Sequence, residues 1–303
     1  MNRPKISFTK NLLNSLVLLF MLIGPGAKVC AQKKGQLAIY DKKNLIAWCV
    51  VPFDSKKRGP EERAEMLKKL GISKLAYDWR DEHIPLFDRE LKVLKKNNIK
   101  LQGFWFASGP NPENDKNLQM ILDVLKRNKA KTQLWCTFWG FDQESQVEKV
   151  KAASVAVGYV AGKLAEIGCS LGLYNHGGWF GEPENQVQII DYLKMPNIGI
   201  VYNFSHSEHQ IDRFPQFYPK ILPHLYAINL TGLKGGIPAA VVPIGQGNME
   251  GGLMRTIMNS SYKGPIGIIN ESFAPDAEDG LKMNMKGINE ILEKLQTSSV
   301  NHN

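Results

Sequence analysis

Three side chains that can transfer protons follow predicted β-strands of this chain. His176 stands after an apolar run in the motif YNHGGW, His206 follows the next run in VYNFSH, and Glu271 follows a later one. Imidazole exchanges protons near neutral pH, and a carboxylate can act as a general base. We therefore predict an acid–base site made of these three groups. A purely structural histidine stays open as the alternative, as does a capping role for Glu271.

Amide and indole side chains lie at the ends of the same predicted strands. They are Asn175, Asn203, Asn229, Trp105, Trp139 and Trp179. An amide can orient hydroxyl and carbonyl groups, and an indole face packs against the C–H face of a sugar ring. We predict that these six residues bind a small carbohydrate. Packing in the protein core is the alternative for the tryptophans.

The elements that must position these residues are short apolar runs separated by amphipathic segments. The predicted strands cover residues 45–51, 74–77, 101–106, 133–139, 171–175, 199–204, 226–230 and 266–270. Most are continuously apolar, as strands covered on both faces are. Helical patterns alternate with them, such as the one that begins near Pro60 and stops at Gly71. This order predicts an α/β fold, a single (β/α)8 TIM barrel, whose site forms at the carboxyl ends of the strands.

An open doubly wound sheet is the alternative arrangement of the same units. Such a sheet binds a dinucleotide at a Gly-rich loop that follows a strand. No such loop follows any predicted strand. The sequence therefore favours the barrel and predicts no nucleotide cofactor.

The first 31 residues have the pattern of a secretory signal peptide. A basic start precedes an apolar run over residues 12–23, and Val29-Cys30-Ala31 supplies small residues for cleavage after Ala31. This run is short for a membrane span, which takes about 20 residues. We expect a periplasmic or secreted protein that leaves the membrane after cleavage, with an uncleaved anchor as the alternative. The expected parts are a signal peptide (1–31), a polar leader (32–44), the barrel (45–296) and a flexible tail (297–303).

Charge and cysteine content narrow the possible partners. Removal of the signal peptide lowers the net charge from +9 to about +5, and the remaining basic residues are mixed with acidic ones, as in EERAEMLKKL. A surface of this kind argues against nucleic-acid binding. Cys49, Cys136 and Cys169 stand in apolar runs without a CxxC motif, which predicts buried thiols, although export permits a disulfide. The oligomeric state stays open.

The succession YNHGGW, VYNFSH, INLTG and PIGQG resembles an exported bacterial branch of the xylose isomerase-like TIM barrels. These proteins are described as sugar phosphate isomerases and epimerases and are related to endonuclease IV. The resemblance covers about residues 45–295. It implies a carbohydrate substrate and proton transfer at a carbon beside a carbonyl group.

The resemblance also implies a degenerate metal site. The superfamily holds a divalent cation such as Mn²⁺ through Glu, Asp, His and Glu at the ends of strands five to eight. The matching positions hold Tyr174, Asn203, Asn229 and either Asn270 or Glu271. Hard cations need anionic oxygen ligands, so a zinc or manganese ion would have to use His176, His206 and Glu271. We favour a protein without a metal.

Two functions from different classes fit these observations. The favoured one is an exported isomerase- or epimerase-like enzyme acting on a sugar or keto sugar, with elimination or hydration as related reactions. The alternative is an inactive barrel that serves as a carbohydrate-binding or accessory protein, because the expected carboxylates are missing. An endonuclease is disfavoured, since it needs more metal ligands and a basic DNA-binding face.

Overall fold

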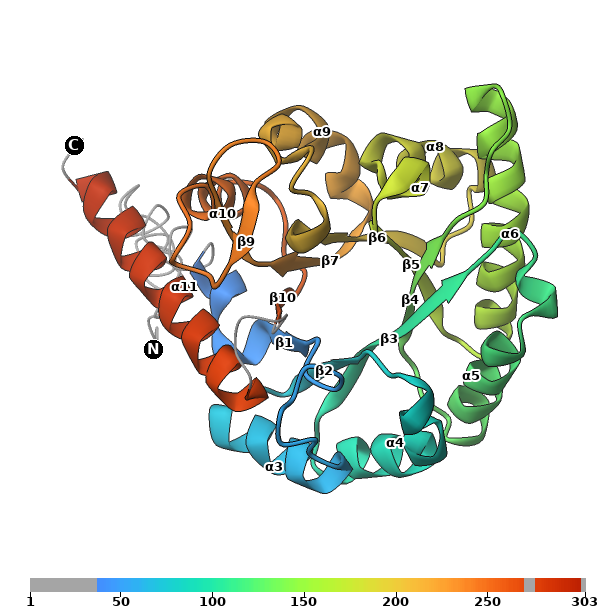
Figure 1. The fold of residues 1–303 in the computed structure, drawn as a ribbon, viewed down its shortest axis with the longest axis horizontal. Coiled ribbons are helices and arrows are strands. Elements are labelled where there is room, and N and C mark those ends of the chain that lie inside the picture. Colours follow the sequence, from blue (N-terminus) through green and yellow to red (C-terminus); the bar gives the residue numbers. More distant parts are fainter. Residues whose placement is uncertain (1–36, 270–275, 301–303) are drawn as a thin grey trace, which may run out of the picture. The chain divides into compact units, whose positions relative to one another are not determined.

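Eight parallel strands close into a barrel in the computed structural model, which describes residues 37–269 and 276–300. They are β1 (Leu45–Trp48), β2 (Lys74–Tyr77), β3 (Lys100–Ser108), β4 (Gln133–Phe138), β5 (Ser170–Tyr174), β6 (Ile198–Asn203), β7 (Leu225–Leu230) and β10 (Ile266–Ile269). Each pairs with the next, and β10 pairs with β1 to close the ring, which is seen end-on in Figure 1. The predicted TIM barrel is confirmed.

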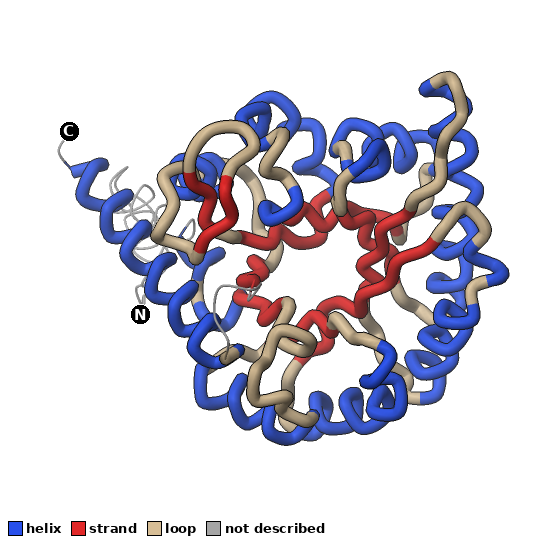
Figure 2. The backbone as a smooth tube through the Cα atoms, in the orientation of Figure 1, coloured by secondary structure: helices blue, strands red, loops and turns tan. Residues whose placement is uncertain are grey.

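Helices surround the strands, as Figure 2 shows. They are α3 (Pro60–Leu70), α4 (Phe87–Lys96), α5 (Lys116–Arg127), α6 (Gln146–Glu166), α7 (Gly178–Gly181), α8 (Pro183–Leu193), α9 (Phe214–Ile221), α10 (Glu250–Met258) and α11 (Ala277–Val300). Local signals set their ends. Pro60 begins α3, and Gly71 ends it in the left-handed conformation at φ 74°. Ser145 caps α6 by accepting a hydrogen bond from the Glu148 amide.

The inside of the barrel is filled by large side chains that face glycines. A Cβ atom at Gly103 would lie 2.5 Å from the ring of Trp135, and one at Gly199 would lie 2.6 Å from the ring of Tyr226. The strands therefore need glycine at these positions so that the aromatic rings can fill the interior. Trp48 and Tyr174 lie against Trp135, with ring centroids 5.1 and 6.3 Å away.

Three features go beyond the elements expected from the sequence. An antiparallel hairpin of β8 (Gly232–Lys234) and β9 (Ala240–Val242) follows β7. Its three-residue strands are too short to produce a recognisable alternation of polar and apolar residues. Ile39 and Tyr40, within the expected polar leader, are buried, and the Tyr40 hydroxyl donates to the Met254 carbonyl at 3.0 Å. Helix α11 extends to Val300, past the expected boundary at residue 296.

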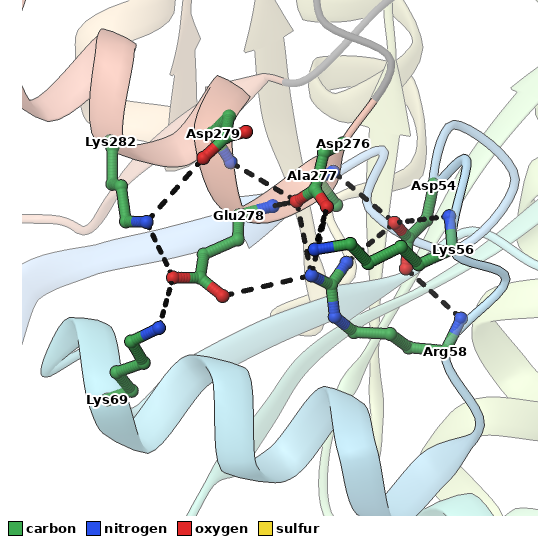
Figure 3. Close-up of polar contacts among 9 residues, drawn as sticks. All are labelled: Asp54, Lys56, Arg58, Lys69, Asp276, Ala277, Glu278, Asp279 and Lys282. Atoms are coloured by element: carbon green, nitrogen blue, oxygen red, sulfur yellow. Dashed lines mark hydrogen bonds and ion pairs between the residues drawn. The ribbon is translucent and has the colours of Figure 1, made fainter.

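A charged cluster ties the loop after β1 to the start of α11 (Figure 3). The Arg58 guanidinium lies 2.6 Å from the carboxylate of Asp54 and 3.1 Å from that of Asp276. Lys56 reaches Asp276 at 2.7 Å. Phe53, in the same loop as Arg58, lines the cavity described below. The cluster therefore fixes the loop that supplies one wall of the site.

The described part of the chain contains no helix suited by length and hydropathy to cross a membrane. Cys49, Cys136 and Cys169 are buried and form no disulfide among the described residues.

Candidate functional site

A cavity of about 420 Å³ opens at the carboxyl ends of the strands, where a TIM barrel places its site. Its aromatic lining comprises Trp48, Phe53, Trp105 and Tyr174, and its polar lining comprises Asp78, Arg80, His176 and His206, together with Cys49. A lining that combines aromatic rings with ionisable groups suits a ligand that is partly apolar and partly polar, as a sugar is.

The two predicted histidines lie side by side in this cavity. Their ring centroids are 4.1 Å apart, with His176 on the turn after β5 and His206 on the turn after β6. Burial, and then the neighbouring His176, lower the pKa of His206 to about 3. His206 is therefore neutral at pH 7, with one ring nitrogen free to donate a hydrogen bond and the other to accept one. His176 is the more exposed of the two.

Asp78 is a cavity residue that was not among the predicted site residues. It follows β2, is 2 % exposed, and neither carboxyl oxygen accepts a hydrogen bond of normal geometry among the described residues. Burial raises its pKa to about 7, although the nearby Arg80 and the backbone amides of Asp78 and Val51 favour the charged form. A carboxyl group that titrates near neutral pH can both accept and return a proton.

Asn175 and Asn203 are fully buried behind the cavity wall and hold the ends of β5 and β6 together. The Asn203 amide donates to the Asn175 side-chain oxygen at 2.6 Å, and the Asn175 side chain donates to the Asn203 carbonyl at 2.9 Å. The Asn203 side chain also donates to the Tyr174 hydroxyl. These contacts position Tyr174 and the two histidine-bearing turns, and they occupy the amide groups that were expected to bind substrate.

Asn229 is also fully buried, opposite Asn203 in the β6–β7 register. Its side chain lies against the backbone of Gly267, at a place where any Cβ atom would collide with it. Neither atom of its amide group makes a hydrogen bond among the described residues. It does not line the cavity, and its role in binding stays a prediction.

The three predicted tryptophans divide between two hollows. Trp105 lines the cavity, and its ring centroid is 5.7 Å from that of His176. Trp139 and Trp179 line a separate hollow of about 200 Å³ between the loops that follow β4 and β5. Gly140, at φ 83°, allows the chain to turn sharply after Trp139. Glu271, the third predicted acid–base group, lies outside the described residues.

Tyr174 and Asn203, two of the positions at which the resemblance implies metal ligands, do not fit a hard divalent cation. The Tyr174 hydroxyl is engaged by Trp48 Nε1 at 3.0 Å and by Asn203, and the Asn203 oxygen accepts from the Ser205 amide at 3.0 Å. These neutral oxygens provide no anionic charge. In the described part of the chain, no three His, Cys, Asp or Glu side chains gather in a group that could hold a metal ion.

Asp78 could have been recognised from one signal in the sequence. It directly follows a buried strand in the segment YDWRDEH, at the end of the barrel where sites form. Asp81, Glu82 and His83 follow closely, so the sequence does not distinguish the carboxyl group that turns into the barrel from those that face water. Only the closed barrel of the structure shows that Asp78 is the carboxyl group that faces the cavity.

Solved structures share this fold at low sequence identity. The IolI protein with a bound zinc atom shares 14% identity at a TM-score of 0.65, covering 83% of this chain and 98% of its own. The 3-keto-D-glucoside 4-epimerase YcjR from E. coli shares 11% sequence identity at a TM-score of 0.60, and the match covers 83% of this chain and 99% of its own. A xylose isomerase-like TIM-barrel protein from Mycobacterium smegmatis in complex with magnesium shares 13% sequence identity at a TM-score of 0.56, and the match covers 82% of this chain and 97% of its own.

The chain therefore has the fold of the xylose isomerase-like TIM barrels, as its motifs predicted. No protein-family model and no curated protein matches it.

Proposed function

We propose that the protein isomerises or epimerises a sugar or keto sugar by moving a proton at a carbon beside a carbonyl group. The observation that carries this proposal is Asp78, a buried carboxyl with a pKa of about 7 in the same cavity as two imidazoles. The likeness of the fold to a 3-keto-D-glucoside 4-epimerase supports the substrate class. Elimination or hydration would begin with the same proton transfer.

The lining groups divide the chemistry between them. The Asp78 carboxylate takes the proton from carbon, and the electron pair of the C–H bond forms an enediolate with the neighbouring carbonyl. The neutral His206 donates a hydrogen bond to the oxygen on which negative charge develops, in the manner of an oxyanion donor. Return of the proton by Asp78 to the adjacent carbon, with transfer of the hydroxyl proton to the former carbonyl oxygen, completes an isomerisation. Delivery of a proton to the opposite face of the original carbon by His176 completes an epimerisation.

The aromatic residues that line the cavity supply the energy that binds the sugar. Trp105 and Phe53 present apolar surface to the cavity, and a sugar packs its C–H face against such rings. Glu271 remains a proposed second proton carrier. The proposal includes a role in carbohydrate turnover outside the cytoplasm.

Proton exchange provides the test. A panel of ketoses and keto glycosides is incubated with the protein in D₂O, and loss of the C–H signal is followed by NMR. We expect exchange with the native protein and a loss of roughly 100-fold or more in Asp78→Asn, which cannot accept the proton. Asp81→Asn is the matched control, because it changes an exposed carboxyl three residues away. It should exchange at the native rate.

Two outcomes would contradict the proposal. Sugar binding without any exchange would favour the alternative, an inactive carbohydrate-binding barrel, which the engaged Tyr174 and Asn203 groups also suggest. Equal rates in the native protein and Asp78→Asn would remove Asp78 from the reaction.

A further inference from the structure

The hollow of about 200 Å³ beside the cavity has the features of a second sugar subsite. His176 lines the cavity, while the next two residues, Gly177 and Gly178, line the hollow. The turn after β5 is therefore a wall common to both. Neither glycine has an atom within 4 Å of the place a Cβ would occupy, so the space above this turn is open. A ligand in the cavity can extend across it.

Trp139 presents an unusual amount of apolar surface to this hollow. Its side chain is 57 % exposed, although the preceding Phe138 is buried and packs on Phe180 with ring centroids 5.2 Å apart. The Trp139 amide donates to the Ser108 carbonyl at 3.2 Å, which fixes the backbone at this point. An exposed indole on an anchored backbone is a ready stacking surface.

The other walls supply a second ring and polar groups. Trp179 Nε1 donates to the Gln146 side chain at 2.7 Å, and its ring packs edge-on against Phe141 at a centroid distance of 6.0 Å. Its orientation is thus fixed. The exposed carboxylate of Asp142 lines the same hollow and can accept hydrogen bonds from hydroxyl groups. Aromatic faces combined with a hydrogen-bond acceptor match the two surfaces of a pyranose ring.

The size of the hollow identifies it as part of a larger binding site. Pockets that enclose a complete drug-sized ligand have about 300–1,000 Å³, so this hollow accommodates one portion of a ligand. The turn after β5 lines both spaces and places the hollow next to the cavity, which favours a ligand that occupies both.

We propose that this hollow binds the second ring of a disaccharide or larger glycoside whose reacting ring lies in the cavity. The substrate class is then glycosides in preference to free monosaccharides. This inference rests on the proposed function for the role of the cavity.

Calorimetric titration with matched pairs of methyl monosaccharides and disaccharides, plain and keto forms alike, tests the subsite without requiring turnover. The native protein should bind the disaccharide about tenfold more tightly than its methyl monosaccharide, the ratio expected for one aromatic stacking contact. Trp139→Ala should remove this advantage while changing the monosaccharide affinity less than about twofold. Tyr192→Ala is the control, because Tyr192 is an equally exposed aromatic residue (56 %) on α8, outside both hollows.

The outcomes separate the two proposals. Equal affinity for both members of every pair, or an equal loss for both in Trp139→Ala, overturns the subsite even if proton exchange is observed. A disaccharide preference that depends on Trp139, without proton exchange, supports the subsite and overturns the proposed reaction. Failure of every sugar to bind overturns both.

Discussion

At the scale of single residues, burial moves the proton affinities of Asp78 and His206 in opposite directions. A carboxyl group is charged when it loses a proton and an imidazole is charged when it gains one, so desolvation raises the pKa of the first and lowers that of the second. The cavity therefore holds both an uncharged imidazole donor and a carboxyl group that titrates near pH 7. This combination suits reversible proton transfer from carbon.

The raised pKa of Asp78 predicts how stability depends on pH. Between about pH 4 and 7 the folded protein retains a proton on Asp78 that the unfolded chain releases, so the fold loses stability as pH rises through this interval. The loss has an upper limit of about 4 kcal/mol at pH 8. Asp78→Asn should match the native free energy of unfolding near pH 4 and exceed it at pH 8.

Urea denaturation at a series of pH values measures this difference. His206 makes the free energy of unfolding depend on pH in the opposite direction. Its lowered pKa causes stability to fall as pH drops from about 6.5 toward 3. That contribution is common to both proteins and cancels in the comparison. Parallel stability curves for the native protein and Asp78→Asn would show that Asp78 titrates normally.

At the scale of elements, the charged cluster of Asp54, Lys56, Arg58 and Asp276 joins the first βα loop to the last helix. Burial alone would raise the pKa of Asp276, but Lys56, the Glu278 amide and Arg58 lower it to about 2. The ionised carboxylate thus stabilises the fold above about pH 4, and this contribution is lost as pH falls toward 2. The cluster acts across the place where the first and last strands meet.

Removal of Arg58 should cost far more stability than removal of an exposed arginine. The Arg58 side chain is only 9 % exposed, and Arg58→Ala removes the cation that pairs with the buried Asp54 carboxylate and leaves Asp276 with Lys56. We expect a loss of about 3 kcal/mol in the free energy of unfolding at pH 7. Arg89→Ala breaks the exposed pair with Glu61 and should cost less than about 1 kcal/mol. Similar losses in urea denaturation of the two variants would contradict this role.

At the scale of the whole molecule, patterning revealed the barrel because most of its strands are covered on both faces. The run over residues 74–77 matches β2 at both ends, and the other strands end within three residues of the expected bounds. The cavity was harder to predict. The order of the strands predicted that His176 and His206 lie at the same cavity. The exposure of Trp139 and the burial of Asp78 depend on tertiary packing, which the sequence pattern does not reveal. So does the use of Asn175 and Asn203 to join strand ends.

The basic and apolar pattern of the first 31 residues predicts that the protein is exported. We propose that residues 1–31 direct secretion and are removed, so the protein recovered from the periplasm or medium should have the mass of a chain beginning at Gln32. Ala31→Leu places a large residue at the cleavage position and should cause the uncleaved precursor to accumulate in the membrane. Intact mass spectrometry of fractionated cells distinguishes the outcomes. Full-length native protein in the membrane would indicate an anchor, and full-length protein free in the cytoplasm would contradict export.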